Sequence, residues 1–218
     1  MDTQTALPDR FRYLPGFQIM PYLRLRQVAT PDNPLELVKG GRLDHVEVAY
    51  ETYGSLSPEK DNAILLCHAL TGDSHPAAHY VDDREGWWED LVGPGQLLDT
   101  ERFFIICPNV LGGCRGTTGP ASPNPATGKP YGADFPVVTI RDMVHVQKRL
   151  LDQLGISKLV MVVGGSMGGM QALEWAVTYP EMAAGVAVIA APGYTTAQAI
   201  AYNDAGRRAI LLDPEYRD

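Results

Sequence analysis

The sequence has no histidine after position 145, no long apolar run and an excess of acidic over basic residues. It contains 26 Asp and Glu against 18 Lys and Arg, which gives a formal net charge of -8. Such a surface has no overall attraction for nucleic acid or anionic lipid, so neither is expected as a partner. The longest apolar stretch, residues 183–191, is far shorter than the roughly 20 residues that cross a bilayer. No membrane segment is therefore expected.

Cysteine is also scarce. The three cysteines, Cys67, Cys107 and Cys114, form no C-x-x-C pair, and Cys67 and Cys107 end apolar runs. We expect them to be reduced and mostly structural, because no motif around Cys114 identifies a base that would make it catalytic. Residues 1–9 lack the basic and apolar regions of a secretory signal. A cytoplasmic protein that binds small molecules is therefore expected.

The strongest positive signal lies at residues 159–175, which predict a strand, a tight turn and a helix. Five apolar residues precede Gly-Gly-Ser-Met-Gly at 164–168, which fits the G-x-S-x-G nucleophile elbow. We predict Ser166 as the nucleophile, exposed at the carboxyl end of the sheet before a helix N-terminus. A phosphate-binding turn is disfavoured because neither G-x-G-x-x-G nor G-K-[ST] is met, which leaves a purely structural turn as the alternative.

Four apolar runs predict strands buried on both faces, at residues 63–67, 103–107, 159–163 and 185–190. Residues 45–53 alternate and predict a half-exposed strand, and an edge strand with water-facing arginines is expected near 22–28. The crossovers are long enough for the strands to return parallel. The sequence therefore predicts an α/β protein with a mostly parallel sheet and helices on both faces. With the G-x-S-x-G elbow, this pattern resembles the α/β-hydrolase fold.

The best helix signal covers residues 139–155, where apolar residues form one stripe. Thr139 can cap the start of this helix, where Asp142 would lie near the positive end of the helix dipole. Gly155 can cap its C-terminus. Besides this helix and the one after the elbow, a further helix is expected after Thr195 or Thr196. Residues 108–136 are rich in Gly and Pro and predict a long irregular loop that walls the active site.

A catalytic serine needs a histidine base, and usually a carboxylate to orient that histidine. α/β-Hydrolases place them in the order Ser, acid, His, yet none of the five histidines follows Ser166. Asp204 and Asp213 do follow it, but they lie in or beside the last predicted helix, which is early for a triad acid. We therefore expect a truncated polypeptide whose triad Asp and His are not in this chain, and which is inactive alone.

His68 opens the loop after the strand at 63–67, where hydrolases place an oxyanion donor, so we expect it to shape that loop rather than act as a base. The predicted oxyanion donors are the backbone N–H groups of Met167 and Leu70. His75 and His79 have the four-residue spacing of some metal ligands. Pro76 lies between them and no H-E-x-x-H motif is present, so no metal site is expected.

Three motifs together carry a family resemblance: His-Ala-Leu-Thr-Gly at 68–72, the Gly-rich run at 108–120 and the elbow at 164–175. In this order and spacing they resemble the homoserine O-acetyltransferase family of α/β-hydrolase-fold acyltransferases. The resemblance extends from about Tyr22 to the end of the chain. It implies that residues 1–193 are the N-terminal part of the hydrolase core, and that residues 194–218 begin a helical lid insertion.

The resemblance also implies a ping-pong reaction. Acetyl-CoA, a co-substrate rather than a permanently bound cofactor, would acylate Ser166, and L-homoserine would take the acetyl group for methionine biosynthesis. Met167 and Leu70 carry over as oxyanion donors, and a homodimer is expected at full length. The resemblance implies that the arginine holding the homoserine carboxylate lies beyond Asp218, so no substrate-binding residue is assigned. Arg207 and Arg208 are expected to form a solvated helix face.

Several alternatives remain open at this stage. A homoserine O-succinyltransferase or a serine-directed relative would carry the same motifs. A plain esterase would use the same nucleophile with water as the acceptor. A noncatalytic hydrolase-fold binding module would not need Ser166 at all.

Overall fold

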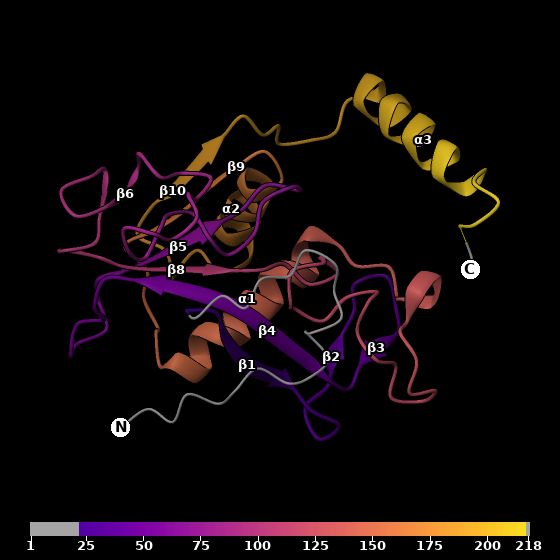
Figure 1. Ribbon diagram of the computed structural model, residues 1–218, viewed down its shortest axis with the longest axis horizontal. Coiled ribbons are helices and arrows are strands. Elements are labelled where there is room, and N and C mark those ends of the chain that lie inside the picture. Colours follow the sequence, from indigo (N-terminus) through magenta and orange to yellow (C-terminus); the bar gives the residue numbers. More distant parts are fainter. Residues whose placement is uncertain (1–21, 217–218) are drawn as a thin grey trace.

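The computed structural model describes residues 22–216, so the expectation of no secretory signal at residues 1–9 lies outside the described residues. Its centre is a six-stranded sheet with the order β1-β4-β8-β5-β9-β10 (Figure 1). The strands are Arg24–Ala29 (β1), Val46–Tyr53 (β4), Ala63–Cys67 (β5), Phe104–Pro108 (β8), Met161–Gly165 (β9) and Val186–Ile189 (β10).

The sheet is mostly parallel, as the apolar runs predicted. β5 pairs in parallel with β8 and β9, and β10 pairs in parallel with β9. Only β4 runs against the other strands, because it pairs antiparallel with both β1 and β8 at one side of the sheet. The arginines of β1 face solvent on this outer strand, as expected for an edge. Because the parallel strands share a direction, their carboxyl ends lie at one edge, where α/β proteins place their ligands.

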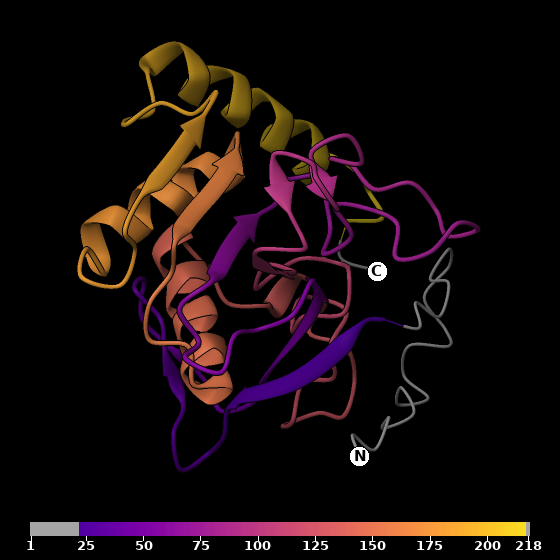
Figure 2. The same ribbon diagram turned by 90° about the vertical axis from the view of Figure 1, so that its left-hand side faces the viewer.

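Alternate residues of the central strands enter two separate apolar layers. Leu65 and Ile106 belong to one layer, which also holds side chains of helices α1 (Ile140–Leu154) and α2 (Met167–Thr178). Figure 2 shows these two helices lying together beside the strands. Leu66 and Ile105 belong to the other layer, where Trp87 and Trp88 pack from the segment between β5 and β8. The central strands are therefore covered on both faces, by helices α1 and α2 on one face and by the segment between β5 and β8 on the other.

Helix α1 begins and ends where the sequence predicted. The Thr139 side chain accepts a hydrogen bond from the Asp142 backbone, and the Asp142 carboxylate accepts one from Thr139 in return. Gly155 closes the helix at φ 72°, a left-handed conformation that glycine adopts without penalty. Asp142 is also buried and accepts a hydrogen bond from the Val38 N–H, so the cap joins the helix to a distant loop.

Two strand predictions need correction. β9 lies two residues later than the apolar run at 159–163, because Gly164 and Gly165 pair with β10 while Leu159 forms only an isolated bridge to Ala183. β4 is not half-exposed, since its polar Glu51 is fully buried. Alternation failed here because histidines from the segment after β5 cover this carboxylate.

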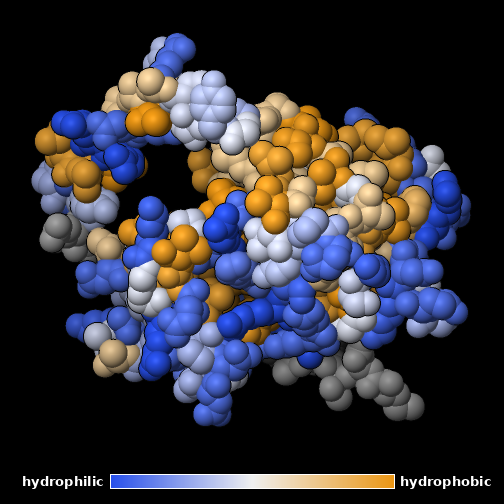
Figure 3. All heavy atoms as spheres, turned by 180° about the vertical axis from the view of Figure 1, so that it is seen from behind, coloured by the Kyte–Doolittle hydropathy of each residue, from blue (hydrophilic) through white to orange (hydrophobic). Residues whose placement is uncertain are grey.

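β10 was predicted to be buried, and this is also wrong. Within residues 22–216 the strand has only β9 as a neighbour, and three of its four residues are exposed. Helix α3 (Ala197–Leu211) follows it, capped by Thr196, but has no buried residue and lies apart from the sheet (Figure 1). Figure 3 shows apolar side chains gathered on the surface over β10 and α2. The exposed members are Val177, Val186, Val188 and Ile189.

Irregular chain connects these elements. Between β5 and β8 lie two short paired strands, Val92–Gly93 (β6) and Leu98–Asp99 (β7), and near the N-terminus lies the pair Leu35–Glu36 (β2) and Arg42–Leu43 (β3). The loop predicted at 108–136 is irregular apart from one short 3-10 turn, Gly132–Asp134. Among residues 22–216, no helix has the length and apolar character needed to span a membrane.

Candidate active site

Ser166 stands at the junction of β9 and α2, in a conformation that a serine rarely adopts. Its φ is 55° and its ψ is -118°, and its side chain is exposed. Its N–H donates to the Ile189 carbonyl at 3.0 Å, and its own carbonyl accepts from Met170 at 3.0 Å. A positive φ costs a non-glycine residue about 1–3 kcal/mol and persists only where the surroundings impose it. The hydroxyl is thereby presented at the carboxyl edge of the sheet.

The flanking glycines impose this turn by allowing close approach. A β-carbon on Gly164 would lie 2.7 Å from the Cys67 carbonyl oxygen and would overlap the backbone of Gly168. A β-carbon on Gly168 would overlap the Cys67 carbonyl and lie 3.0 Å from that of His68. Strand β9, helix α2 and the end of β5 can therefore approach one another only without these side chains.

His68 directly follows β5 and has a buried side chain whose two ring nitrogens are both engaged. Its Nε2 accepts from the Val110 N–H at 3.2 Å, which requires the proton on Nδ1, and Nδ1 then donates to the Ala69 carbonyl at 2.7 Å. Burial lowers the pKa of His68, against smaller opposing effects from Ala69 and Asp73. The ring is neutral and has no free nitrogen for the Ser166 proton. It shapes the loop, as the sequence indicated.

The predicted oxyanion donors lie on two segments that one glutamine joins. Leu70 is 77% exposed on the loop after β5, and Met167 is the first residue of α2. Within residues 22–216, neither N–H group donates to another residue, so both are free for a ligand. Gln171 Nε2 lies 3.3 Å from the carbonyl oxygens of both His68 and Met167. The loop and the helix start are thus held next to each other.

Gln171 and Gln147 are residues that sequence reasoning missed. Gln147 on α1 donates to Gln171 Oε1 at 2.6 Å and accepts from the Trp175 indole N–H at 2.7 Å. All three side chains are buried, so each polar atom needs such a partner. The available signal was a polar residue at a core position of each predicted helix. This network fixes α1 and α2 behind the serine.

The remaining titratable candidates have other partners. Asp204, which follows Ser166 in the chain, pairs with Arg207 and Arg208 on the exposed helix α3, at 2.8 and 2.7 Å. His145 is half-buried against the Tyr179 ring. His45 is exposed and lies 3.4 Å from Gln27. Within the described residues, no histidine or carboxylate is therefore placed to act with Ser166.

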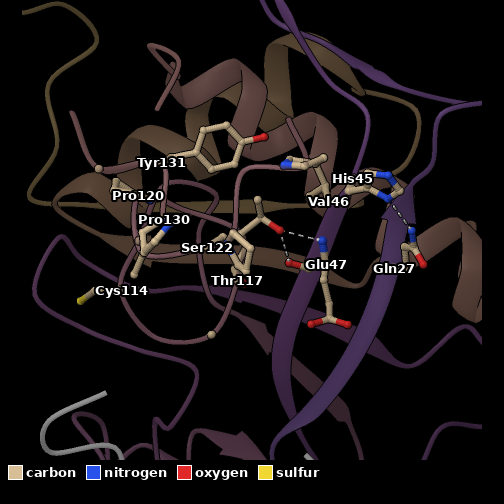
Figure 4. A pocket seen from close by; sticks show the side chains of 17 residues that line it. Gln27, His45, Val46, Glu47, Cys114, Thr117, Pro120, Ser122, Pro130 and Tyr131 are labelled. Carbon is tan, nitrogen blue, oxygen red and sulfur yellow. Dashed lines mark hydrogen bonds between the residues drawn. The ribbon is translucent and has the colours of Figure 1, made fainter. Parts of the chain in front are cut away.

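A pocket of about 990 Å³ lies along the start of β4 (Figure 4). The loop after β8 forms much of its wall, and the Thr118 hydroxyl holds this loop to β4 by accepting from the Glu47 N–H at 2.9 Å. Labelled residues such as His45, Cys114 and Tyr131 surround the hollow in Figure 4. Ser166 and Leu70 are not in its lining. The expectation that this loop walls the active site therefore stays a prediction.

An exposed serine at positive φ, between a buried parallel strand and a helix N-terminus, is the arrangement by which hydrolase-type α/β proteins present a nucleophile, so Ser166 is the candidate for that role. The chain belongs to the alpha/beta hydrolase fold family, whose model matches residues 62–218.

Curated relatives agree with the motif resemblance. The chain is 61% identical over 184 residues to a homoserine O-acetyltransferase of Methanosphaerula palustris, and 58% identical over 195 residues to one of Symbiobacterium thermophilum. It is 56% identical over 187 residues to a homoserine O-succinyltransferase of Dechloromonas aromatica. These matches cover 84%, 88% and 85% of the chain, and 38%, 51% and 50% of the relatives. The chain thus spans about half or less of their length.

Solved structures confirm the fold. The homoserine O-acetyltransferase from Bacillus anthracis matches with a TM-score of 0.82 at 35% identity, over 91% of this chain and 55% of that one. Esterase E22 matches with a TM-score of 0.79 at 41% identity, over 88% of this chain and 53% of that one. The fold is thus shared by proteins named as transferases and as esterases.

Proposed function

We propose that this chain supplies the nucleophile and oxyanion hole of a homoserine O-acetyltransferase. The observation that carries the proposal is the strained, exposed Ser166 at the start of α2. The relatives named for this activity, at 53–61% identity, favour acetyl transfer to homoserine over other chemistry of the same fold. Because the chain spans only part of their length, the activity of the whole protein is inferred rather than given by the matches.

In the first half-reaction, the Ser166 hydroxyl attacks the thioester carbonyl carbon of acetyl-CoA. The new C–O bond forms while the hydroxyl proton passes to a general base. The carbonyl oxygen takes the negative charge and accepts hydrogen bonds from the Met167 and Leu70 N–H groups, aided by the positive end of α2. The C–S bond then breaks, the protonated base returns its proton to the sulfur, and CoA leaves as the thiol.

In the second half-reaction, the side-chain hydroxyl of L-homoserine attacks the acetyl-Ser166 ester. The base accepts the homoserine proton and gives it to the Ser166 oxygen as the ester bond breaks. The products are O-acetyl-L-homoserine and free Ser166, and the same two N–H groups serve both tetrahedral intermediates. The product would feed methionine biosynthesis in the cytoplasm.

The general base and its orienting acid are proposed to be a histidine and an aspartate outside these 218 residues. His68 is unsuited because both its nitrogens are engaged. Residues 1–193 would form the N-terminal part of the catalytic core. Residues 194–218 would begin a helical lid, which fits the absence of buried residues in α3. The complete protein would act as a homodimer without a permanently bound cofactor.

Acetyl transfer by the full-length protein tests this proposal. Acetyl-CoA and L-homoserine should yield O-acetylhomoserine and one thiol per turnover, and acetyl-CoA alone should leave one acetyl group on Ser166 by peptide mass spectrometry. Ser166→Ala should abolish both results. Ser157→Ala, at an exposed serine in the loop before β9, is the matched control and should change neither. An acetylated protein with no homoserine product would overturn the acceptor assignment.

Two other outcomes have specific support. The 56% identity to a homoserine O-succinyltransferase makes succinyl-CoA the necessary rival donor in the same assay. The likeness to esterase E22 makes water the rival acceptor, tested by hydrolysis of an aryl acetate without homoserine. A larger kcat/KM with either rival would replace the proposed reaction. A binding activity that survives Ser166→Ala would favour a noncatalytic module.

A further inference from the structure

A buried cluster of polar side chains surrounds Glu51 on β4. The Glu51 carboxylate is fully buried, and its Oε2 lies 2.8 Å from His75 Nδ1 and 2.8 Å from His79 Nε2. Tyr53 places its hydroxyl 3.1 Å from the same oxygen, and Ser74 donates to Oε1 at 3.0 Å. The proposed reaction does not use these groups, so the cluster needs another explanation.

The hydrogen positions in this cluster follow from its acceptors. His75 Nε2 lies 2.8 Å from the Arg84 carbonyl oxygen, which can only accept, so Nε2 carries a proton. Nδ1 faces Glu51, whose carboxylate also receives donors from His79 and Ser74. When a carboxylate that already accepts several hydrogen bonds shares a proton with an imidazole, the proton resides on the imidazole. Both His75 nitrogens therefore carry protons, and the ring is a cation.

The electrostatic surroundings agree with this assignment. Burial alone would raise the pKa of Glu51, but hydrogen bonds and charge from His75 and His79 lower it to about 2. Burial opposes the charged form of His75, yet the contacts with Glu51 and the Arg84 carbonyl raise its pKa above the ordinary value. The other titratable or charged groups that face the pair are Tyr53, Asp73, His79, Asp83, Arg84 and Cys107.

The cluster is connected to the loop that carries Leu70. Ser74, bonded to Glu51, also donates its N–H to Asn109 Oδ1 at 2.9 Å and accepts from Asn109 Nδ2 at 3.0 Å. At the other end of the loop, His68 accepts from the Val110 N–H. Both ends of residues 68–74 are therefore fastened to the two residues after β8, and the Glu51 cluster supports one of these attachments.

We propose that His75 is a buried imidazolium whose ion pair with Glu51 is a positioning device for the oxyanion loop, acting through Ser74. The term oxyanion loop denotes residues 68–74. The positioning role rests on the proposed function of Leu70, whereas the protonation of His75 stands independently of it. His75 does not touch the reacting atoms, so it is a positioning residue rather than a catalytic one.

A divalent metal ion is the competing occupant. Glu51, His75 and His79 offer three ligand atoms within 4.8 Å of one another, and the Arg84 carbonyl would orient His75 as carbonyls orient metal-bound histidines. Tetrahedral zinc at ordinary bond lengths would hold its nitrogen and oxygen ligands about 3.3 Å apart. The observed 2.8 Å separations from Glu51 are direct hydrogen-bond distances instead. A shared proton therefore fits better than a metal.

Nitrogen-15 NMR of the histidine rings in the 218-residue polypeptide tests the protonation. At about pH 6, below the ordinary histidine pKa, His75 should show protons on both ring nitrogens, whereas His68 should show a single Nδ1 proton and serves as the internal reference. Zn²⁺ is the metal probe, added at one equivalent. A singly protonated His75, or loss of its Nδ1 proton on stoichiometric Zn²⁺ binding, would overturn the proposal.

Two variants test the positioning role, read from exchange of the Gly72 amide, which donates to Ala69 within the loop. Glu51→Gln should leave His75 singly protonated, and should accelerate Gly72 exchange about tenfold through the loss of a charge-assisted hydrogen bond. Ser74→Ala should keep His75 doubly protonated but still accelerate exchange of the Gly72 amide. This variant provides the test if Glu51→Gln does not fold. Glu36→Gln, at an exposed carboxylate, is the control.

Unchanged Gly72 exchange in Ser74→Ala would remove the positioning role. Neither measurement depends on acyl transfer, so failure of the proposed function and failure of this inference are separate results. In the full-length protein, Ser74→Ala should lower kcat about tenfold with KM for acetyl-CoA unchanged, because the interaction acts on the oxyanion and not on the bound substrate.

Discussion

Gly168 on α2 packs so closely against the Cys67 carbonyl of β5 that a β-carbon on the glycine would overlap this oxygen. The contact involves two backbones, so a rotamer change cannot relieve it. It fixes the distance between the first turn of α2 and the end of β5, the two segments that carry Met167 and lead to Leu70. The geometry of the candidate oxyanion hole therefore depends on a position without a side chain.

Gly168→Ala should lower the free energy of unfolding by about 2–3 kcal/mol, as expected when a packed contact is overfilled. Urea unfolding of the 218-residue polypeptide measures this change. Gly206→Ala on the exposed helix α3 has nothing within contact distance and should be neutral or stabilising. Equal effects of the two substitutions would contradict the role of the close approach.

Ser166→Gly should stabilise the protein while removing its proposed nucleophile. A glycine adopts φ 55° without the strain that serine carries, so the free energy of unfolding should rise by about 1 kcal/mol. Ser157→Gly, outside the helices and strands, lacks this strain at its φ and should be neutral or mildly destabilising. Thermal and urea unfolding measure both. A destabilised Ser166→Gly variant would show that the turn stores no strain.

Gln171→Ala should destabilise the protein and weaken catalysis. The substitution removes the link between the His68 and Met167 carbonyls and leaves Gln147 Nε2 without its buried acceptor. The free energy of unfolding should fall by about 2 kcal/mol. Urea unfolding and acetyl transfer by the full-length protein measure the two effects. Gln96→Ala, at an exposed glutamine, is the control and should leave both unchanged. A stable and fully active Gln171→Ala variant would exclude the bridging role.

The Glu51–His75 pair should make stability depend on pH in both directions. The pKa of Glu51 is lowered, so its contribution is complete above the unfolded value near 4.3 and is lost as pH falls towards 2. The pKa of His75 is raised, so its contribution is complete below the unfolded value near 6.5 and is lost as pH rises through the folded value.

The difference in unfolding free energy between the wild type and Glu51→Gln should therefore be largest between about pH 4.5 and 6.5, at about 3 kcal/mol. Urea unfolding of both proteins across pH measures it, with Glu36→Gln as the reference for a solvated carboxylate. A difference that does not vary with pH would show that the pair is not ionised.

Val188→Lys should reduce self-association of the 218-residue polypeptide. In the part of the chain that the structure describes, β10 exposes apolar side chains and an unpaired edge, and natural proteins protect such strands with an inserted lysine. Light scattering at matched concentrations measures the change. Val137→Lys places the same charge at an exposed valine of the loop before α1 and should have little effect. Equal solubility of wild type and Val188→Lys would show that this edge does not associate.

Local signals predicted the elbow and helix α1 because they arise within a few residues. Ser166 needs glycines that are its sequence neighbours, and the Thr139–Asp142 cap needs a spacing of three residues. Both predictions are confirmed in geometry. The burial of Glu51 was not predictable in this way, since its partners lie 24 and 28 residues away and meet it only in the folded sheet.

The exposed β10 was mispredicted for a related reason. Its apolar composition predicts burial, but burial requires a neighbour on each side and a covering helix, whereas the described residues give it only β9 and part of α2. The apolar composition of a strand indicates that the strand needs neighbours to cover it. The composition does not indicate whether residues 22–216 supply those neighbours.

The Ser166 N–H donates to the Ile189 carbonyl, so the proposed nucleophile is attached by its backbone to the least protected strand of the sheet. Transient opening of β10 would release that hydrogen bond and let the strained turn relax. The fraction of molecules with a poised nucleophile would then follow the local opening equilibrium of β10 rather than global stability. Any partner or chain segment that covers this strand would act as an activator of Ser166 without approaching its hydroxyl.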